Sequence, residues 1–165
     1  MIILGIDPGY DRLGCAIIKK DGGCDKLIFS DYLTSDKKMP PEKRLAHLSN
    51  NLKKIFTKYK PDHLAIEKVF FTNNQKTASR VSEAVGMILT MAGLNAVAVA
   101  EMSPPEIKMA ITGYGAAEKG QVQKMVKLIL KIEKMPKLDD EVDAIAIALA
   151  LSSKISTLKI KGLDK

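Results

Sequence analysis

Four carboxylates stand where apolar segments of this chain begin or end, and this placement constrains the fold more than any other feature. Asp7 and Glu67 each close a short, strand-like apolar run, whereas Asp140 and Asp143, three residues apart, open the helical run of residues 142–151. A carboxylate at the end of a buried segment is costly to leave unpaired, and several of them together repel one another. The pattern therefore predicts that the fold gathers these acids around a positive partner.

Each acid alone has an ordinary explanation. Asp7 precedes a Pro-Gly pair and is typical of a turn, Glu67 has Lys68 beside it, and Asp140 and Asp143 are typical of the first turn of a helix. Taken together, the four favour a metal site, because hard divalent cations such as Mg²⁺ take carboxylate oxygens together with substrate phosphates. The sequence thus predicts a metal-dependent phosphoryl-transfer site.

The order of elements predicts an α/β domain with a mixed sheet. The predicted strands cover residues 2–8, 12–20, 25–34, 63–69 and 95–100. Helices are expected to start at Pro40-Pro41, before Val81, at Ser103, at about Ala117 and at about Asp139. The first three strands follow one another through tight turns and the last two follow helices, so we expect an antiparallel region followed by parallel strands. If the first and fourth strands are neighbours, Asp7 and Glu67 lie side by side.

The length fits one domain, expected to cover residues 1–152, with a basic tail over 153–165 that has little to pack. No apolar stretch is long enough to span a bilayer, and no basic segment precedes the first apolar run. We therefore expect a cytoplasmic protein without a membrane segment. In that compartment Cys15 and Cys24 are expected to be free thiols, not directly opposite each other in the predicted hairpin.

Lysine and arginine number 26 against 19 acidic residues, which gives a net charge of +7. With the acids gathered in one site and the bases spread around it, this balance suits a polyanionic substrate. Charge alone is weak evidence, since many proteins are modestly basic. The lysines of 124–134 are expected to form a solvated helix face.

Four motifs in order resemble the RuvC-type Holliday-junction resolvases, a branch of the ribonuclease H-like nucleases. They are residues 3–9 (Ile-Leu-Gly-Ile-Asp-Pro-Gly), 61–70 (Pro-Asp-His-Leu-Ala-Ile-Glu-Lys-Val-Phe), 113–126 (from Gly-Tyr-Gly-Ala-Ala-Glu-Lys to Met-Val) and 140–148 (Asp-Glu-Val-Asp-Ala-Ile-Ala-Ile-Ala). The resemblance runs from residue 1 to about residue 151. It implies a five-stranded ribonuclease H-like sheet and a homodimer that cuts two opposing strands of a four-way DNA junction. It also implies two Mg²⁺ (or Mn²⁺) per subunit and branch-migration motor proteins as possible partners.

Residue by residue, the resemblance implies that Asp7, Glu67, Asp140 and Asp143 hold the metals, with Asp7 as the natural bridge. The family's basic residues near the site match Lys108 and Lys119, and Lys119 or Lys108 is expected to neutralise charge in the transition state. On the DNA side, the expected contacts are Phe70, Phe71, Asn74 and Lys76. Only one of the two phenylalanines is expected to stack on a base, because neighbours on a strand face opposite ways.

One departure concerns the turn after Asp7. The family usually has Thr-Gly there and this chain has Leu13-Gly14, so its contacts with DNA are expected to differ. Three alternatives remain open at this point. They are a nuclease of the same fold acting on RNA or on other branched DNA, an ATP-binding domain of the actin and sugar-kinase kind, and a junction-binding module without activity. The second needs greater length and a further phosphate loop.

Overall fold

The structure is a computed structural model that describes residues 1–68 and 75–162, with side chains up to Lys68 and from Ala78 to Ser156. Five strands form one sheet in the order β3-β2-β1-β4-β5. The strands are β1 (Ile2–Asp7), β2 (Arg12–Asp21), β3 (Cys24–Thr34), β4 (His63–Glu67) and β5 (Ala98–Met102). The helices are α1 (Pro41–Tyr59), α2 (Gln75–Leu94), α3 (Pro104–Thr112), α4 (Lys119–Leu130) and α5 (Asp139–Gly162).

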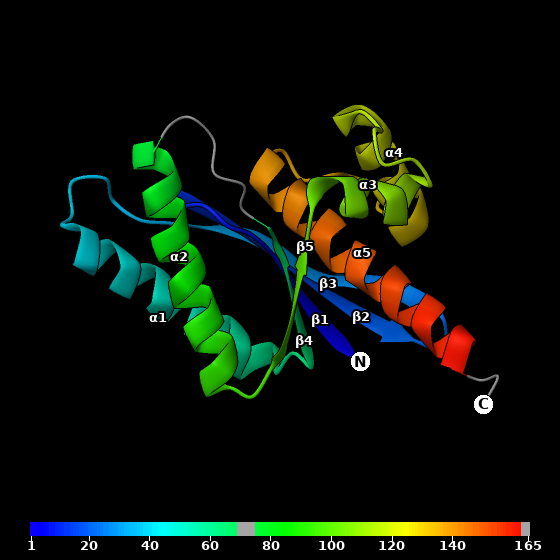
Figure 1. Ribbon diagram of the computed structural model, residues 1–165, viewed down its shortest axis with the longest axis horizontal. Coiled ribbons are helices and arrows are strands. Elements are labelled where there is room, and N and C mark those ends of the chain that lie inside the picture. The colour runs from blue at the N-terminus through cyan, green and yellow to red at the C-terminus, as the bar shows by residue number, and fades with distance from the viewer. Residues whose placement is uncertain (69–74, 163–165) are drawn as a thin grey trace.

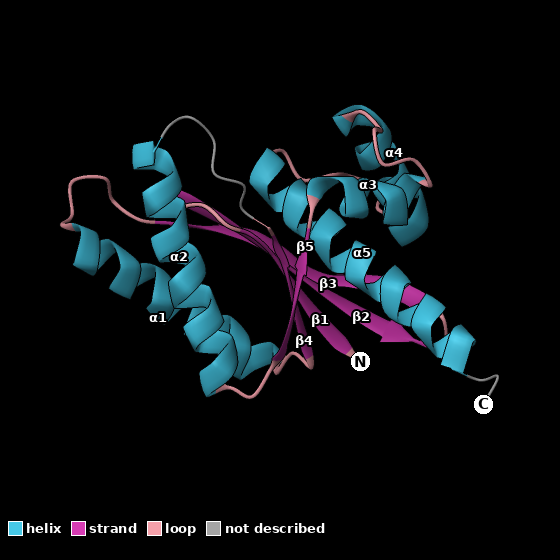
Figure 2. Cartoon of the chain, in the orientation of Figure 1, coloured by secondary structure: helices cyan, strands magenta, loops and turns pink. Residues whose placement is uncertain are grey.

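Helices cover both faces of the sheet (Figures 1 and 2). The pair α1 and α2 lies on one face, and α5 runs across the other, with α3 and α4 beside it. The β1–β2 and β2–β3 pairs are antiparallel, whereas β1–β4 and β4–β5 are parallel. The predicted mixed sheet is therefore confirmed, and β1 and β4 are neighbours as the placement of the two acids required.

The alternation of side chains along the strands divides the core into two clusters. Against α1 and α2, the central strands present large apolar side chains, all of them buried: Leu4, Ile6, Leu13, Cys15, Ile17, Leu64 and Ile66. Against α5, the same strands present Ile3, Ala16, Ile18 and Ala65. By the same period of two, Asp7 and Glu67 belong to the face covered by α5.

The fifth strand lies about three residues further along the chain than predicted. Residues 95–97 close the end of α2 instead: the backbone N–H groups of Asn95, Ala96 and Val97 donate to carbonyls of the last turn, and Ala96 adopts a φ of 53°. The small and β-branched residues of this segment predict a strand. Their N–H groups instead donate to the carbonyls that the end of α2 leaves unpaired.

The later helices also differ from prediction at their ends. The apolar pattern predicts that the helix starting at about Ala117 runs to Glu133, but α4 ends at Leu130, because Lys131 turns into the left-handed region with a φ of 51°. Helix α5, expected to end near Ser152, continues to Gly162. Ile155 still packs against the core, so the segment after Ser152 begins as a packed helix and not as a frayed end.

Two smaller expectations concern cysteines and membranes. Cys15 is buried and lies opposite Asp31 in the β2–β3 ladder, Cys24 is exposed, and both are free thiols as predicted. Within the described part of the chain, no helix combines the length and the apolar character needed to cross a bilayer.

Candidate active site

Two of the predicted acids meet because two parallel strands end together. Ile6 of β1 is in register with Ile66 of β4, so Asp7 and Glu67, the next residues, end adjacent strands on the same face of the sheet. Parallel strands bring their carboxyl ends to one edge, which is where polar site residues gather in such sheets. The sequence prediction for this pair is confirmed in its geometry.

The other two acids reach this edge because α5 approaches the sheet unusually closely. A Cβ atom on Gly14 would lie 1.9 Å from the carbonyl oxygen of Asp140, and one on Gly5 would lie 2.3 Å from that of Ala144. No side chain fits in either place. Gly14 is also the residue opposite Asp7 in the β1–β2 ladder. The first turn of α5 is therefore seated directly beside Asp7.

The pKa values show how closely the acids are gathered. The pKa of Asp7 is raised from 3.8 to about 7, first by burial and then by the charges of Asp143, Glu67 and Asp140, with the charge of Lys119 opposing them. Burial and the charge of Asp143 also raise the pKa of Glu67, while Lys119 and Lys108 oppose the shift. The four predicted acids thus act on one another electrostatically, as carboxylates sharing one site do.

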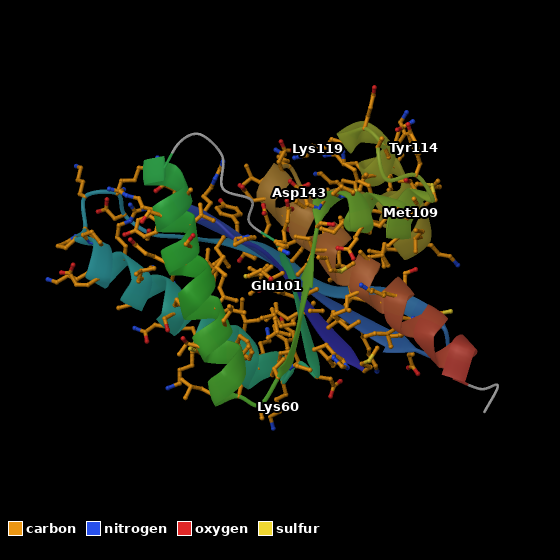
Figure 3. The ribbon with its side chains drawn as sticks, in the orientation of Figure 1. Lys60, Glu101, Met109, Tyr114, Lys119 and Asp143 are labelled. Carbon is orange, nitrogen blue, oxygen red and sulfur yellow. The ribbon has the colours of Figure 1, made fainter. Side chains whose placement is uncertain are left out.

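Asp140 and Asp143, the two acids of α5, are each paired with a basic side chain. Lys119 Nζ donates to Asp143 Oδ2 at 2.9 Å and lies 3.4 Å from Asp139 Oδ2; Figure 3 shows Lys119 and Asp143 side by side. Burial alone would lower the pKa of Lys119, but the hydrogen bond and charge of Asp143, with Asp139, outweigh it and raise the pKa. On the other side, Arg12 Nε lies 3.0 Å from Asp140 Oδ2.

Lys108 lies near the same acids. A cavity of about 260 Å³ is lined by Glu67, Lys108, Lys119 and Asp143, together with apolar residues of α3, α4 and α5. The structure therefore brings both predicted lysines, one from α3 and one from α4, to the acidic edge. Lys119 makes direct ion pairs there, while Lys108 acts on Glu67 through its charge.

The chemistry of these residues fits a hard divalent cation. Asp7 carries a partly buried carboxylate that three other carboxylates repel, and a bound cation would relieve the repulsion among all four. As the side chains stand, the described residues contain no group of three or more acidic, histidine or cysteine side chains arranged to hold an ion. Asp140 is paired with Arg12 and Asp143 with Lys119, each through its Oδ2 atom. A metal ion would compete with these two cations for the carboxylates.

The remaining predicted residues are Phe70, Phe71, Asn74 and Lys76, whose side chains lie outside the described part of the chain. Leu13, the departure from the family's usual Thr, is fully buried in the core under α1 and α2. It therefore faces away from Asp7.

Sequence reasoning missed the residues that shape the turn between Asp7 and β2. Arg44 of α1 is buried, donates to Asp11 Oδ1 at 2.6 Å and to the carbonyl of Tyr10 at 3.3 Å, and stacks on the Tyr10 ring. Its hydrogen bond is the main reason that the pKa of Asp11 lies below its usual value. A signal existed: Arg44 falls on the same helical stripe as Leu48 and Leu52, where a charged residue needs a buried partner.

Comparisons with known proteins show the family to which the chain belongs. The profile of the crossover junction endodeoxyribonuclease RuvC family matches residues 3–151. The crossover junction endodeoxyribonuclease RuvC of Petrotoga mobilis is 44% identical over 148 residues, which cover 90% of this chain and 91% of the relative. Another from Thermosipho melanesiensis is 42% identical over 152 residues, covering 92% and 97%.

Solved structures show the same relation. The structure of T. thermophilus RuvC in complex with a Holliday junction substrate superimposes with a TM-score of 0.89 at 28% identity, over 94% of each chain. The yeast mitochondrial Holliday junction resolvase Ydc2 shares the fold, with a TM-score of 0.71 at 14% identity over 95% of this chain and 80% of that one. From the profile match and these relatives, the chain belongs to the RuvC family of crossover junction endodeoxyribonucleases.

Proposed function

We propose that this chain is a structure-selective endonuclease that resolves four-way DNA junctions by metal-dependent hydrolysis of phosphodiester bonds, in recombination and repair. The observation that carries the proposal is the convergence of Asp7, Glu67, Asp140 and Asp143 at one sheet edge, in a chain of the RuvC family. The basic surplus of +7 supports a polyanionic substrate around that edge.

In this proposal Asp7, Glu67, Asp140 and Asp143 hold two Mg²⁺ ions, for which Mn²⁺ substitutes. When bound, a pair of such ions activates a water and stabilises the leaving 3′ oxygen. Asp7 is central because its strand lies between β2 and β4. Lys119, whose pKa is raised, stays protonated at neutral pH and neutralises charge that develops on the phosphate. Lys108 holds the strand from the other side of the cavity. The cut leaves 5′-phosphate and 3′-hydroxyl ends.

Symmetric cutting of two opposing strands requires two such sites, and one chain supplies one. We therefore infer a homodimer with two-fold symmetry, the commonest arrangement of soluble oligomers. Phe70 or Phe71 would stack on a base near the cut, with Asn74 and Lys76 on the backbone beside it. We further propose a cytoplasmic location, contact with branch-migration motor proteins, and a supporting role in DNA binding for the basic residues of 153–165.

The experiment that tests the function is cleavage of a synthetic four-way junction with and without Mg²⁺, with the incision sites mapped. We expect paired cuts on opposing strands, and no cuts in EDTA. A fork, a flap, a linear duplex and an RNA–DNA hybrid serve as competitors. A preference for the hybrid or the flap would show that the substrate is of another class. Binding of the junction without any cutting would show a junction-binding module.

A matched variant separates binding from catalysis. Asp7→Asn should lower cleavage by at least about 10³-fold, because metal ions contribute several kcal/mol to such reactions and each 1.4 kcal/mol is a factor of ten. Junction binding should persist and should weaken steeply with salt, because phosphate contacts release counterions. Undiminished cutting by Asp7→Asn would refute the assignment of the site.

A further inference from the structure

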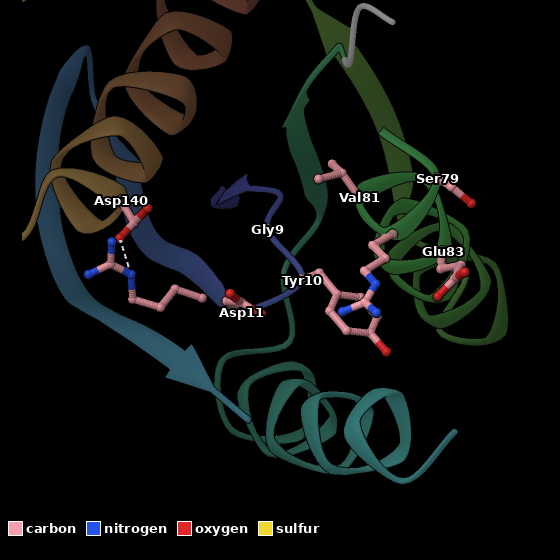
Figure 4. Close-up of a pocket in the computed structure, with 9 residues that line it drawn as sticks. Gly9, Tyr10, Asp11, Ser79, Val81, Glu83 and Asp140 are labelled. Carbon is pink, nitrogen blue, oxygen red and sulfur yellow. Dashed lines mark ion pairs between the residues drawn. The ribbon is translucent and has the colours of Figure 1, made fainter. Parts of the chain in front are cut away.

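A large cleft of about 680 Å³ adjoins the acidic edge. It is lined by the turn from Gly9 to Arg12, by Asp140, and by Ser79, Arg80, Val81 and Glu83 of α2. In Figure 4, Asp140 stands on one side of the cleft and Tyr10 and Val81 on the other. The cleft is therefore continuous with the proposed metal site at Asp140, and it extends from there toward α2.

Two arginines stand at the two sides of this cleft. Arg12 is tied to Asp140 by the 3.0 Å ion pair, drawn as a dashed line in Figure 4. The guanidinium of Arg80 lies 5.4 Å from the centre of the Tyr10 ring, whose other neighbour is the buried Arg44. The ring thus holds Arg80 at the wall of the cleft. Each guanidinium is suited to a phosphate, which it binds through two parallel hydrogen bonds.

The ion pair between Arg12 and Asp140 is weak enough to be replaced by other partners. The Arg12 side chain is 51% exposed and that of Asp140 26%, so the pair is screened by solvent and costs little to open. Asp140 is one of the acids that the proposed function assigns to the metal. The same lone pair of its Oδ2 atom cannot accept from Arg12 and bind a cation. A cation that takes Oδ2 would therefore compete with Arg12 and free its guanidinium for the cleft.

We propose that Arg12 and Arg80 bind backbone phosphates of the cut strand along this cleft, and that Arg12 becomes available to the strand only when a metal ion takes Asp140. In this exchange the Asp140 carboxylate pairs with the metal in place of Arg12. The Arg12 guanidinium pairs with a phosphate in place of Asp140, so neither charge stays unpaired. The proposal rests on the proposed function, since it requires Asp140 to be a metal ligand. It makes metal and junction binding mutually supportive, because such coupling is reciprocal.

The test uses the full-length protein and four variants, each checked for folding by circular dichroism. Mn²⁺ affinity of the DNA-free protein is measured by electron paramagnetic resonance. Junction affinity is measured by fluorescence anisotropy in EDTA and in Ca²⁺. The variants are Arg12→Gln, Arg12→Lys, Arg80→Gln and Asp140→Asn. Arg80→Gln removes the same charge from the same cleft without touching Asp140, so it is the matched control.

Arg12→Gln should tighten Mn²⁺ binding in the DNA-free protein by about two- to fivefold, the range of an exposed ion pair that no longer competes. It should weaken junction binding about tenfold in Ca²⁺ and much less in EDTA, because Arg12 is already occupied there. Arg80→Gln should leave Mn²⁺ affinity unchanged and weaken the junction equally with and without metal. Arg12→Lys, which keeps the charge, should stay close to the wild type in Mn²⁺ affinity.

The outcomes separate this inference from the function on which it rests. Unchanged Mn²⁺ affinity in Arg12→Gln, with weakened Mn²⁺ affinity in Asp140→Asn, would overturn the exchange and leave the metal site intact. Unchanged Mn²⁺ affinity in Asp140→Asn would instead overturn the assignment of Asp140 itself. Equal losses of junction affinity in EDTA and in Ca²⁺ for Arg12→Gln would show an ordinary phosphate contact and contradict the release of Arg12 by metal.

Discussion

The two faces of the sheet are packed in different ways. Toward α1 and α2 the central strands present bulky side chains such as Leu4, Ile6 and Ile17. Toward α5 they also present Gly5, Gly14 and Ala16, and the facing positions of α5 include Ala144 and Ala148. The absence of side-chain volume at these positions lets a helix that carries two carboxylates reach Asp7. Close approach on the second face serves the site.

The largest expected effect breaks the close approach itself. Gly14→Ala places a Cβ 1.9 Å from the Asp140 carbonyl oxygen, far inside van der Waals contact, so the start of α5 must move. Overpacking of this kind costs roughly 1–3 kcal/mol of stability, and a displacement of about 1 Å at a reacting group lowers rates roughly 10²-fold. Urea unfolding and junction cleavage by the folded fraction measure the two losses.

Gly93→Ala is the matched control for that variant. No atom lies within 4 Å of the Cβ it would add, and Gly93 is in the last turn of α2. Cleavage should be retained and helix stability should rise by up to about 1 kcal/mol. If Gly14→Ala cleaves as well as Gly93→Ala, the close seating of α5 is not what assembles the acids.

The next effect is the loss of stability that follows from ionising Asp7, on the sheet face covered by α5. Asp7 has a folded pKa of about 7 against 3.8 for the ordinary group. Between these values the folded protein holds a proton that the unfolded chain has released, so stability in EDTA falls as pH rises from about 4 to about 7. The full loss, up to roughly 4 kcal/mol, is reached above pH 7.

Urea unfolding of the wild type and of Asp7→Asn at pH 5 and pH 8, in EDTA, measures this loss. Asn does not titrate, so the variant should be more stable than the wild type at pH 8 and similar to it at pH 5. Added Mg²⁺ should restore the wild type at pH 8, because a ligand that binds only the folded state stabilises it. If the stability of the two proteins depends on pH in the same way, the raised pKa of Asp7 is contradicted.

A substitution on the opposite face should cost stability without touching the chemistry. Leu52→Ala leaves a cavity in the fully buried cluster under α1, which typically costs about 3 kcal/mol. Cleavage per folded molecule should match the wild type, since Leu52 and Asp7 lie on different faces. A specific loss of cleavage in the folded fraction would mean that the two faces are coupled more tightly than their packing indicates.

The smallest expected effect lies near the middle of α5. Ser152 is fully buried, donates to Asp25 Oδ1 at 2.5 Å and accepts from Lys20 Nζ at 3.0 Å. Ser152→Ala should cost about 1 kcal/mol, the usual net value of such a hydrogen bond, with cleavage unchanged. A loss of cleavage without a loss of stability would show that this part of the helix influences the acids in its first turn.

The sequence predicted much of this arrangement because the informative residues stand at element ends. Alternating apolar runs and the Pro-Gly turn indicated the strands, and the acids at their ends indicated the site. The close seating of α5 could not be predicted, because the pairing of Gly14 with Asp7 depends on strand register and its contact with Asp140 depends on helix packing. The partner of Asp140, Arg12, was missed for the same reason.

Element ends were predicted less well where local hydrogen bonds compete. Residues 95–97 have the composition of a strand, but their N–H groups complete the end of α2. Helix α5 passes Ser152 because Ile155 still finds the core, which a chain read without its tertiary packing does not reveal.

The most direct test of the central claim is a crystal of the protein soaked with Mn²⁺, with anomalous scattering used to locate the ions. We predict anomalous peaks within about 2.2 Å of carboxylate oxygens of Asp7 and of at least one of Glu67, Asp140 and Asp143, with Asp140 no longer within hydrogen-bond distance of Arg12. Ions bound elsewhere on the surface, with these four side chains unchanged and Asp7 without a peak, would contradict it.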